Sequence, residues 1–183
     1  MGKRFDLQQQ ADTVSLAERL VAKLKERGLT CVTAESCTGG GVGGAITAVP
    51  GSSAVFLGGV ISYANEVKRD VLGVPQEILD THGAVSPECA ERMAAGARYL
   101  LKADLAVSLT GIAGPDGGSA EKPVGLVWFG LATKDGVHTE KKVFSGDRAS
   151  VRAQAVTHAL GLLLSAASSS PSSTAVRDVR GLA

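Results

Sequence analysis

The amino-acid sequence predicts an α/β protein, a three-layer α/β/α sandwich on a mixed, mostly parallel sheet of about five strands. The first reason is that segments with helical spacing of apolar residues alternate with short apolar segments rich in β-branched residues. The second is that the last two apolar segments are joined by Lys134-Asp135-Gly136, which is typical of a β-hairpin. Helices between the early strands favour parallel pairing, and the hairpin adds antiparallel strands to the same sheet.

The first third of the chain predicts a helix, a strand, a second helix and a second strand. Residues 11–27 carry apolar side chains at helical spacing, and Gly28 ends this helix. A strand over 29–34 follows, and a glycine-rich turn leads into a helix that reaches about Val49. Residues 55–63 form an apolar run that we interpret as a buried strand. The inward positions of the first helix are expected at Val14, Leu16, Ala17, Leu20, Val21 and Leu24.

The middle of the chain predicts three further helices. Asn65 is the expected N-cap of a short helix over 66–72, and Pro75 opens another short helix. Ser86-Pro87-Glu88 combines a capping serine with proline at the first helical position, which predicts a helix to about Lys102. The side chains expected inward on this helix are Cys89, Met93, Ala97 and Leu100.

The last third predicts three strands and a final helix. Residues 105–110 form an apolar strand, and 124–133 and 137–144 are the two arms of the hairpin. Asp147 is the expected cap of a helix that runs to about Ala166.

Length and composition predict one domain over residues 1–167 and a disordered serine-rich tail over 168–183. The formal net charge is +1, the basic residues are scattered and there are only seven aromatic residues, so we expect no nucleic-acid partner. Three cysteines without CxxC spacing indicate a reducing, cytoplasmic compartment and no metal site. Because no apolar run approaches about 18 residues and the first residues lack a signal-peptide core, we expect no membrane association.

The turn between the first strand and the second helix carries two hydroxyls and a thiol. Free backbone N–H groups at such a turn favour negative charge, so the turn suits a phosphate, or a nucleophile beside an oxyanion site. Thr38, Gly39 and Gly40 are the candidates that bind substrate there, because glycines allow close backbone approach. Ser36 and Cys37 are rival nucleophiles, and alternation along an extended segment predicts that only one of them faces the cleft.

Polar groups follow each of the first three strands, in the segments 36–41, 63–68 and 110–118. In an open α/β sheet these segments meet at the carboxyl ends of the strands, where ligands bind. We therefore expect one cleft at that edge.

Five motifs occur in an order that is found in a known family. They are Thr33-Ala34-Glu35-Ser36-Cys37-Thr38-Gly39-Gly40, Ser62-Tyr63-Ala64-Asn65 with Lys68, Gly83-Ala84-Val85-Ser86, Thr110-Gly111-Ile112-Ala113-Gly114-Pro115, and Val124-Gly125. Together they resemble the C-terminal domain of the competence/damage-inducible protein CinA. The resemblance covers about residues 11–166.

This resemblance implies an activity. Stand-alone members of the CinA family hydrolyse nicotinamide mononucleotide to nicotinic acid mononucleotide and ammonia, a step of pyridine-nucleotide recycling, without metal or cofactor. By position, the family's serine–lysine amidohydrolase mechanism implies Ser36 as nucleophile, Lys68 as base and Tyr63 as assisting hydroxyl. It also implies a homodimer and a small-molecule nucleotide substrate.

The choice of Lys68 as base also makes chemical sense. The histidines, which are the usual bases, are His82, His138 and His158, and all three stand outside the motifs. With Asn65 as cap, Lys68 is the third residue of a helix, at its positive end. That position and desolvation in a cleft should both lower the lysine pKa and supply a neutral amine.

Two groups of residues are candidates for holding the ribose and the phosphate. Thr110, Gly111 and Gly114 supply a hydroxyl and flexible backbone. Arg148 and Arg152 are four residues apart on the last helix, hence on one face, and either can pair with a phosphate.

Two other functions stay open at this point. Gly39-x-Gly41-x-x-Gly44 matches the dinucleotide fingerprint, with Glu66 about 20 residues further on, which would make the protein a dinucleotide-binding oxidoreductase. The match is weak, because residues 35–38 separate the strand from the first glycine. The same cleft also suits a non-catalytic nucleotide-binding domain. Ammonia release distinguishes a hydrolase from such a domain, whereas tight retention of a dinucleotide favours the oxidoreductase.

Overall fold

The computed structural model describes residues 2–169, with side chains described from residue 8 onward. Its sheet has the strand order β2-β1-β3-β4-β5. The strands are β1 (Cys31–Glu35), β2 (Phe56–Ile61), β3 (Leu105–Gly111), β4 (Leu126–Thr133) and β5 (Gly136–Val143). β1 pairs in parallel with β2 and β3, whereas β4 pairs antiparallel with β3 and β5, so four of the five strands run in one direction. The predicted mixed, mostly parallel sheet is confirmed.

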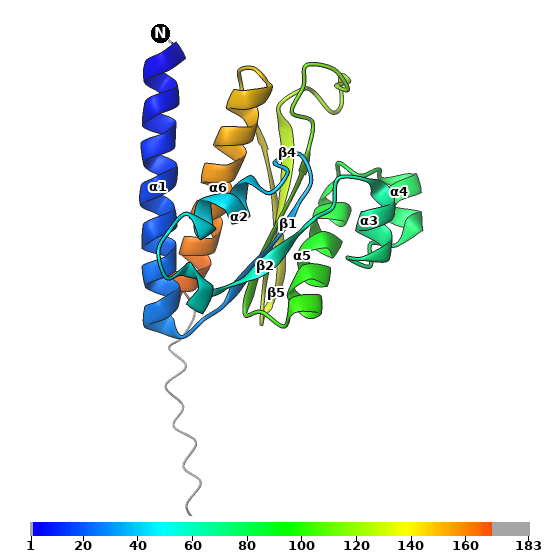
Figure 1. The fold of residues 1–183 in the computed structure, drawn as a ribbon. Coiled ribbons are helices and arrows are strands. Elements are labelled where there is room, and N and C mark those ends of the chain that lie inside the picture. The colour runs from blue at the N-terminus through cyan, green and yellow to red at the C-terminus, as the bar shows by residue number, and fades with distance from the viewer. Residues whose placement is uncertain (1, 170–183) are drawn as a thin grey trace, which may run out of the picture.

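Helices cover both faces of this sheet, as the three-layer prediction requires. The helices are α1 (Gly2–Arg27), α2 (Gly41–Thr47), α3 (Asn65–Asp70), α4 (Gln76–Thr81), α5 (Pro87–Leu101) and α6 (Arg148–Ser169), with a short 3-10 turn η1 (Ser52–Ala54). α1, α2 and α6 lie on one side of the sheet, and α3, α4 and α5 lie on the other (Figure 1). Apart from Ser168 and Ser169, which end α6, the predicted tail lies outside the described residues.

The two faces of β3 carry side chains of different size. Leu105, Val107 and Leu109 point toward α1 and α6. The opposite face carries small side chains such as Ser108, whose hydroxyl donates to the Ala90 carbonyl of α5 at 2.6 Å. Because these side chains are small, α5 packs closely against this face of the sheet, which leaves no room for a large residue.

One strand and two helix positions that apolarity alone predicts to be buried are more exposed than expected. β2 alternates between half-buried and exposed residues, because it is an edge strand with one neighbour. Val14 is 56% exposed, since the inward position on that turn of α1 is Thr13, whose hydroxyl contacts Thr157 of α6. Leu100 is 48% exposed, because the buried stripe of α5 continues through Leu101 instead.

Two of the three predicted caps are confirmed. The Ser86 hydroxyl accepts from the Cys89 N–H at 3.2 Å, and Asp147 accepts from the Ser150 N–H at 2.8 Å. The Asn65 cap is wrong. Ala64 has the extended conformation of the cap residue, so Asn65 is already the first residue of α3 and Lys68 is the fourth.

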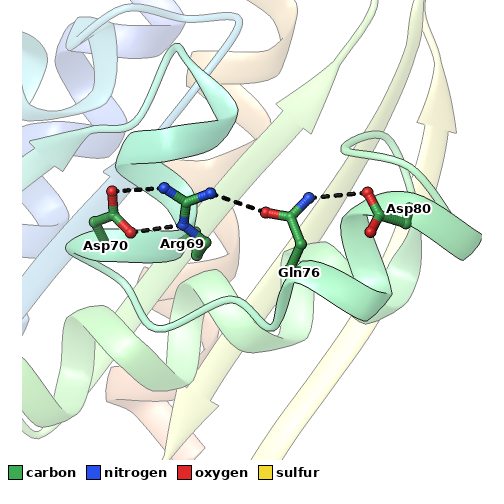
Figure 2. Close-up of polar contacts among 4 residues, drawn as sticks. All are labelled: Arg69, Asp70, Gln76 and Asp80. Carbon is green, nitrogen blue, oxygen red and sulfur yellow. Dashed lines mark hydrogen bonds and ion pairs between the residues drawn. The ribbon is translucent and has the colours of Figure 1, made fainter.

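A chain of surface contacts joins α3 to α4. Arg69 pairs with its neighbour Asp70 and also donates to Gln76 of α4 at 3.0 Å (Figure 2). Gln76 in turn donates to Asp80 at 2.8 Å. Because these groups are exposed, the contacts contribute little stability.

Across the described residues, no helix combines the length and apolar character that a membrane crossing requires.

Candidate active site

A pocket of about 210 Å³ lies at the carboxyl ends of the parallel strands. The strand register brings these ends together, since Glu35 is the partner of Ile61 in β2 and of Leu109 in β3. The lining residues are Ser36, Cys37, Tyr63, Asn65, Lys68, Ala84, Val85, Thr110, Gly111, Ala113 and Arg148. All three segments that the sequence assigns to the cleft contribute to it.

Ser36 and Lys68 meet at the bottom of this pocket. The Lys68 Nζ atom lies 3.3 Å from the Ser36 hydroxyl oxygen, and both side chains are buried, with 1% and 9% of Lys68 and Ser36 exposed. The same amine donates to the backbone carbonyls of Ser62 at 2.7 Å and of Tyr63 at 3.2 Å. A neutral amine has two N–H groups, so with both on carbonyls its lone pair is free to face the serine hydroxyl.

Burial lowers the pKa of Lys68 below its ordinary value. The thiols of Cys89 and Cys37 and the carboxylate of Glu66 act in the opposite direction, but desolvation is the larger effect. The direction agrees with the expectation from sequence. Removal of water on burial is the largest cause of the lowered Lys68 pKa.

The turn that carries Ser36 is held from the inside by Glu35, which is 1% exposed. Its carboxylate accepts from the Thr38 hydroxyl at 2.7 Å. It also accepts from the first turn of α2, through the N–H groups of Val42 at 3.1 Å and Gly43 at 2.9 Å. The free helix donors that the sequence suggests for a phosphate or an oxyanion are therefore already occupied by Glu35.

Arg152 holds the same turn from the side of α6. Its Nη2 atom donates to the Thr38 carbonyl at 2.9 Å, and its Nε atom is buried without a partner. Gly39 and Gly40 have φ angles of +60° and +93°, which a glycine adopts at no steric cost. Thr38, Gly39, Gly40 and Arg152 thus shape the turn and lie outside the pocket lining.

Cys37 and Ser36 both line the pocket, so the expected alternation does not separate them. The reason is that β1 ends at Glu35 and the chain turns immediately afterwards. The two side chains differ in chemistry instead. Burial raises the pKa of the Cys37 thiol to about 11, and the neighbouring Glu35 carboxylate acts in the same direction. The thiolate is the reactive form of cysteine, so Cys37 is a poor nucleophile near neutral pH.

Tyr63 and Arg148 stand together at the mouth of the pocket. The Tyr63 side chain is 62% exposed, and its hydroxyl accepts from Arg148 Nη2 at 3.2 Å. Arg148 Nη1 donates to the Gly114 carbonyl at 2.9 Å. The phenol therefore contacts the arginine, whereas Lys68 is contacted by the Tyr63 backbone carbonyl. Gly114 itself lies outside the lining.

Thr110 and Gly111 form the wall at the end of β3. The Thr110 hydroxyl donates to the Ala84 carbonyl at 2.6 Å, which leaves its oxygen as an acceptor. A Cβ atom at Gly111 would come within 2.6 Å of the Leu126 carbonyl oxygen, so the wall requires glycine there.

Four residues line the pocket without having been predicted as binding residues, namely Asn65, Ala84, Val85 and Ala113. Asn65 is the most informative of them, since the sequence offers a cap as the simpler explanation for it. Its place three residues before Lys68 on one helix was the available signal, because residues at that spacing share a face.

A larger cavity of about 1100 Å³ lies elsewhere, between α1, α2 and α6. Its described lining is mostly small or apolar, and Asp147 is the only charged residue in it. Such a lining lacks the convergent polar groups of a catalytic site. The smaller pocket is therefore the candidate active site.

The three histidines do not line the pocket. His158 contacts Glu140 and packs edge-on against Phe129, with ring centroids 4.8 Å apart. His82 faces Glu88 at 3.5 Å. Among the residues that the structure describes, no three histidine, cysteine or acidic side chains gather as metal ligands would.

The dinucleotide fingerprint does not fit its surroundings. It requires a pyrophosphate on the N–H groups that begin α2. Glu35 already accepts from two of those groups, and its carboxylate would repel a phosphate. Glu66, the expected ribose partner, lies within α3. The geometry argues against a Rossmann-type nucleotide site.

Comparisons with known proteins agree with this picture. The chain is 51% identical to the nicotinamide-nucleotide amidohydrolase PncC of Escherichia coli K12 over 154 residues, which cover 84% of this chain and 93% of that protein. It is 52% identical to a CinA-like protein of a Synechococcus species, covering 84% of this chain and 37% of that one. The crystal structure of the competence/damage inducible protein CihA from Agrobacterium tumefaciens matches with a TM-score of 0.82 and 46% identity, over 84% of this chain and 94% of that one.

The relatives differ in length. The chain spans 37% and 33% of two longer curated relatives, and most of the shorter ones. Residues 13–167 match the CinA C-terminal domain, which is most of the chain. This protein therefore belongs to the CinA C-terminal domain family.

Proposed function

We propose that this protein is a nicotinamide-nucleotide amidase that hydrolyses nicotinamide mononucleotide to nicotinic acid mononucleotide and ammonia. The observation that carries the proposal is the contact of 3.3 Å between the Lys68 amine and the Ser36 hydroxyl in a buried pocket. The name of the Escherichia coli relative, an amidohydrolase of nicotinamide nucleotides, supports the choice of substrate.

In the first half of the proposed reaction, the Ser36 hydroxyl oxygen attacks the carboxamide carbon and its proton passes to neutral Lys68. The C–N bond then breaks, and the Lys68 ammonium returns the proton to the leaving nitrogen, which departs as ammonia. The product of this half is an ester between the Ser36 oxygen and the carboxyl group of nicotinic acid mononucleotide. A lysine whose pKa is lowered by burial can perform both proton transfers.

In the second half, water attacks the ester carbon while Lys68 takes its proton. The bond to the Ser36 oxygen breaks, and the proton returns to that oxygen. The carboxylic acid leaves as nicotinic acid mononucleotide. Each half develops negative charge on the carbonyl oxygen, which requires a donor.

The Cys37 N–H is our candidate for this donor. It belongs to the residue after the nucleophile, lines the pocket and donates to no acceptor in another described residue. The Gly39 and Gly41 N–H groups, by contrast, donate to Ser36 and Thr38 carbonyls within the turn. An N–H directly after the nucleophile is a frequent oxyanion donor in serine hydrolases.

The pocket of about 210 Å³ is smaller than the roughly 300–1,000 Å³ that is usual for ligand sites. It fits the pyridine carboxamide, with the ribose and phosphate extending toward the mouth. Arg148 stands there with no acidic partner among the described residues, so it is our candidate for the phosphate. We assign Arg152 to the support of the Ser36 turn, because it donates to Thr38. Tyr63 as an assisting hydroxyl stays a prediction.

A parallel assay of ammonia release tests the proposed function. Nicotinamide mononucleotide, nicotinamide riboside and free nicotinamide are each incubated with the protein in the presence of a chelator. We expect rapid release from the mononucleotide and much slower release from the other two, because they lack the phosphate that Arg148 binds. Tight nucleotide binding without any ammonia would instead favour a non-catalytic nucleotide-binding domain.

The proposal includes three further expectations. The catalytic domain ends near residue 167, and residues 168–183 are dispensable for activity. The protein works in the cytoplasm, which agrees with three buried free cysteines. It forms a homodimer, which sedimentation analysis of the purified chain can test.

A further inference from the structure

Asn65 is the polar residue of the pocket whose side chain has no hydrogen-bond partner in the described part of the chain. Ser36, Tyr63, Thr110 and Arg148 all have hydrogen-bond partners within the protein. Among the described lining residues, Asn65 carries the only side-chain oxygen and nitrogen that make no hydrogen bond. It does not cap α3 either, because it is the first residue of that helix. Its carboxamide is therefore available to a ligand.

The position of Asn65 relative to Lys68 indicates which part of a substrate it meets. The two residues are three apart on α3 and both line the pocket. Lys68 is buried at the bottom, whereas Asn65 is exposed nearer to the mouth. In the proposed reaction Lys68 must deliver a proton to the leaving nitrogen, so that nitrogen lies on the α3 side of the pocket. Asn65 is on the same side.

The chemistry of the leaving group matches what Asn65 offers. A primary carboxamide ends in an NH₂ group with two donors, and the asparagine oxygen is an acceptor. When the Asn65 oxygen accepts a hydrogen bond from one N–H of the substrate, this bond fixes the rotation of the leaving NH₂ group about the C–N bond. After attack by Ser36, the nitrogen lone pair can then face Lys68, which is the geometry that proton transfer needs.

We propose that Asn65 is the specificity-determining residue that selects a primary amide by accepting a hydrogen bond from its leaving NH₂ group. This inference rests on the proposed function. It predicts discrimination between an amide and an ester with the same acyl group, because an ester leaving group has no N–H to donate.

The test compares nicotinamide mononucleotide with the methyl ester of nicotinic acid mononucleotide, by release of ammonia and of methanol. The enzymes are the wild type, Asn65→Ala and Asn65→Asp, with Gln76→Ala as control. Gln76 carries an exposed carboxamide on α4 (Figure 2). It is not among the residues that line the pocket. The quantity of interest is the ratio of kcat/KM for the amide to that for the ester, measured at a pH where the rate no longer rises.

For Asn65→Ala we expect this ratio to fall about tenfold, the effect of losing one hydrogen bond, mainly through kcat for the amide. The ester rate and the melting temperature should change little, since the Asn65 side chain is exposed and makes no hydrogen bond to another described residue. Asn65→Asp keeps an acceptor oxygen and should retain the ratio. Its negative charge near Lys68 should also move the acidic limb of the pH profile to higher pH. Gln76→Ala should match the wild type.

The inference and the proposed function fail separately. If wild-type protein releases no ammonia from nicotinamide mononucleotide, the proposed amidase is contradicted. If the wild type is active but Asn65→Ala lowers amide and ester rates equally, or changes neither, the role of Asn65 is contradicted. An equal rise in KM for both substrates would mean that Asn65 contacts the ribose or phosphate, and would also overturn the inference.

Discussion

Two buried ionisable residues near Ser36, Glu35 and Lys68, have opposite surroundings. Each side chain is 1% exposed. Glu35 accepts three hydrogen bonds from the turn after Ser36 and from α2. Lys68 donates to two carbonyls of the segment after β2, and its remaining direction leads to the Ser36 hydroxyl and the pocket.

This difference indicates that Glu35 has a structural role and Lys68 a chemical one. The partners of Glu35 are all fixed protein groups, so the residue stabilises the turn and has nothing to exchange with a substrate. Lys68 lies in a desolvated position that lowers its pKa, and one of its contacts is a group that can donate a proton. The comparison predicts that substitutions at Glu35 affect folding first, and those at Lys68 affect catalysis first.

The largest effect is expected for Ser36→Ala, which removes the hydroxyl that Lys68 contacts. We expect kcat to fall by about 10⁴-fold or more, as for other serine nucleophiles. Binding of nicotinamide mononucleotide, measured by calorimetry, should change little, because the pocket keeps its shape. Retention of substantial ammonia release would contradict Ser36 as nucleophile.

Lys68→Met should show a large loss of activity without a loss of stability. A general base contributes about 10²–10⁴-fold, so kcat should fall by that amount. Methionine fills the same space without a buried amine, although two carbonyls lose a donor. The melting temperature should therefore fall by no more than about 4 °C, equivalent to about 1 kcal/mol. A cooperative collapse of the fold would mean that Lys68 is structural, like Glu35.

The pH dependence of the wild type sharpens this prediction. Activity requires the neutral amine, so it should rise with pH through the lowered pKa of Lys68. The unfolded chain binds the Lys68 proton more tightly than the folded protein. The free energy of unfolding should therefore rise with pH between the lowered pKa and the ordinary value of 10.5. In Lys68→Met, neither the activity nor the free energy of unfolding should show this rise with pH. An unchanged acidic limb of the pH–activity profile in that variant would exclude Lys68 as the base.

Local sequence signals predicted most of the fold, because they depend on residues close in the chain. The Ser86 and Asp147 caps and the alternation of helices and strands are of this kind. The exposure of β2 could not be predicted, since it depends on which strands lie at the edge of the sheet. Polar Thr13 at an inward position of α1 shows the same limit, because its partner Thr157 is far away in the sequence.

The candidate site divides in a similar way. Topology alone predicts that segments after parallel strands meet, and Ser36 and Lys68 do meet. The different surroundings of Arg148 and Arg152 could not be predicted, because the two residues are only one helical turn apart. Arg148 contacts Tyr63 at the mouth of the pocket, whereas Arg152 contacts Thr38 in the turn that carries Ser36. Nor does the sequence indicate that Glu35 reaches seven and eight residues ahead to occupy the donors of α2.

Glu35→Ala should show the converse of Lys68→Met, with stability lost first. Three donors would be left without an acceptor, at about 1–3 kcal/mol for each group that stays buried. The lower end of that range for all three groups is about 3 kcal/mol, so we expect the melting temperature to fall by roughly 6–12 °C or more. Displacement of Ser36 should lower kcat by about 10–100-fold in the protein that stays folded. Glu35→Gln keeps the size and one acceptor oxygen, so it should lie between the wild type and Glu35→Ala.

A matched control for Glu35 is Glu77→Gln, an exposed residue on α4 outside the pocket. It should change neither the melting temperature nor the rate. If Glu35→Gln lowers kcat as much as Lys68→Met but leaves the melting temperature at the wild-type value, Glu35 takes part in the chemistry. The structural interpretation of this residue would then be contradicted.

The smallest effect is expected for Cys37→Ala, although Cys37 adjoins Ser36 and lines the same pocket. With a thiol pKa of about 11, roughly one protein in several thousand carries the reactive thiolate near pH 7.5. We expect kcat to stay within about threefold of the wild type, because the Cys37 N–H is a backbone group that alanine retains. The small cavity should destabilise the fold by about 1 kcal/mol.

Alkylation of Cys37 by iodoacetamide in the folded wild type should be slow, because few molecules carry the reactive thiolate. An inactive Cys37→Ala beside an active Ser36→Ala would identify the Cys37 thiol as the nucleophile. A group other than Glu35 would then have to lower the thiol pKa, since Glu35 raises it.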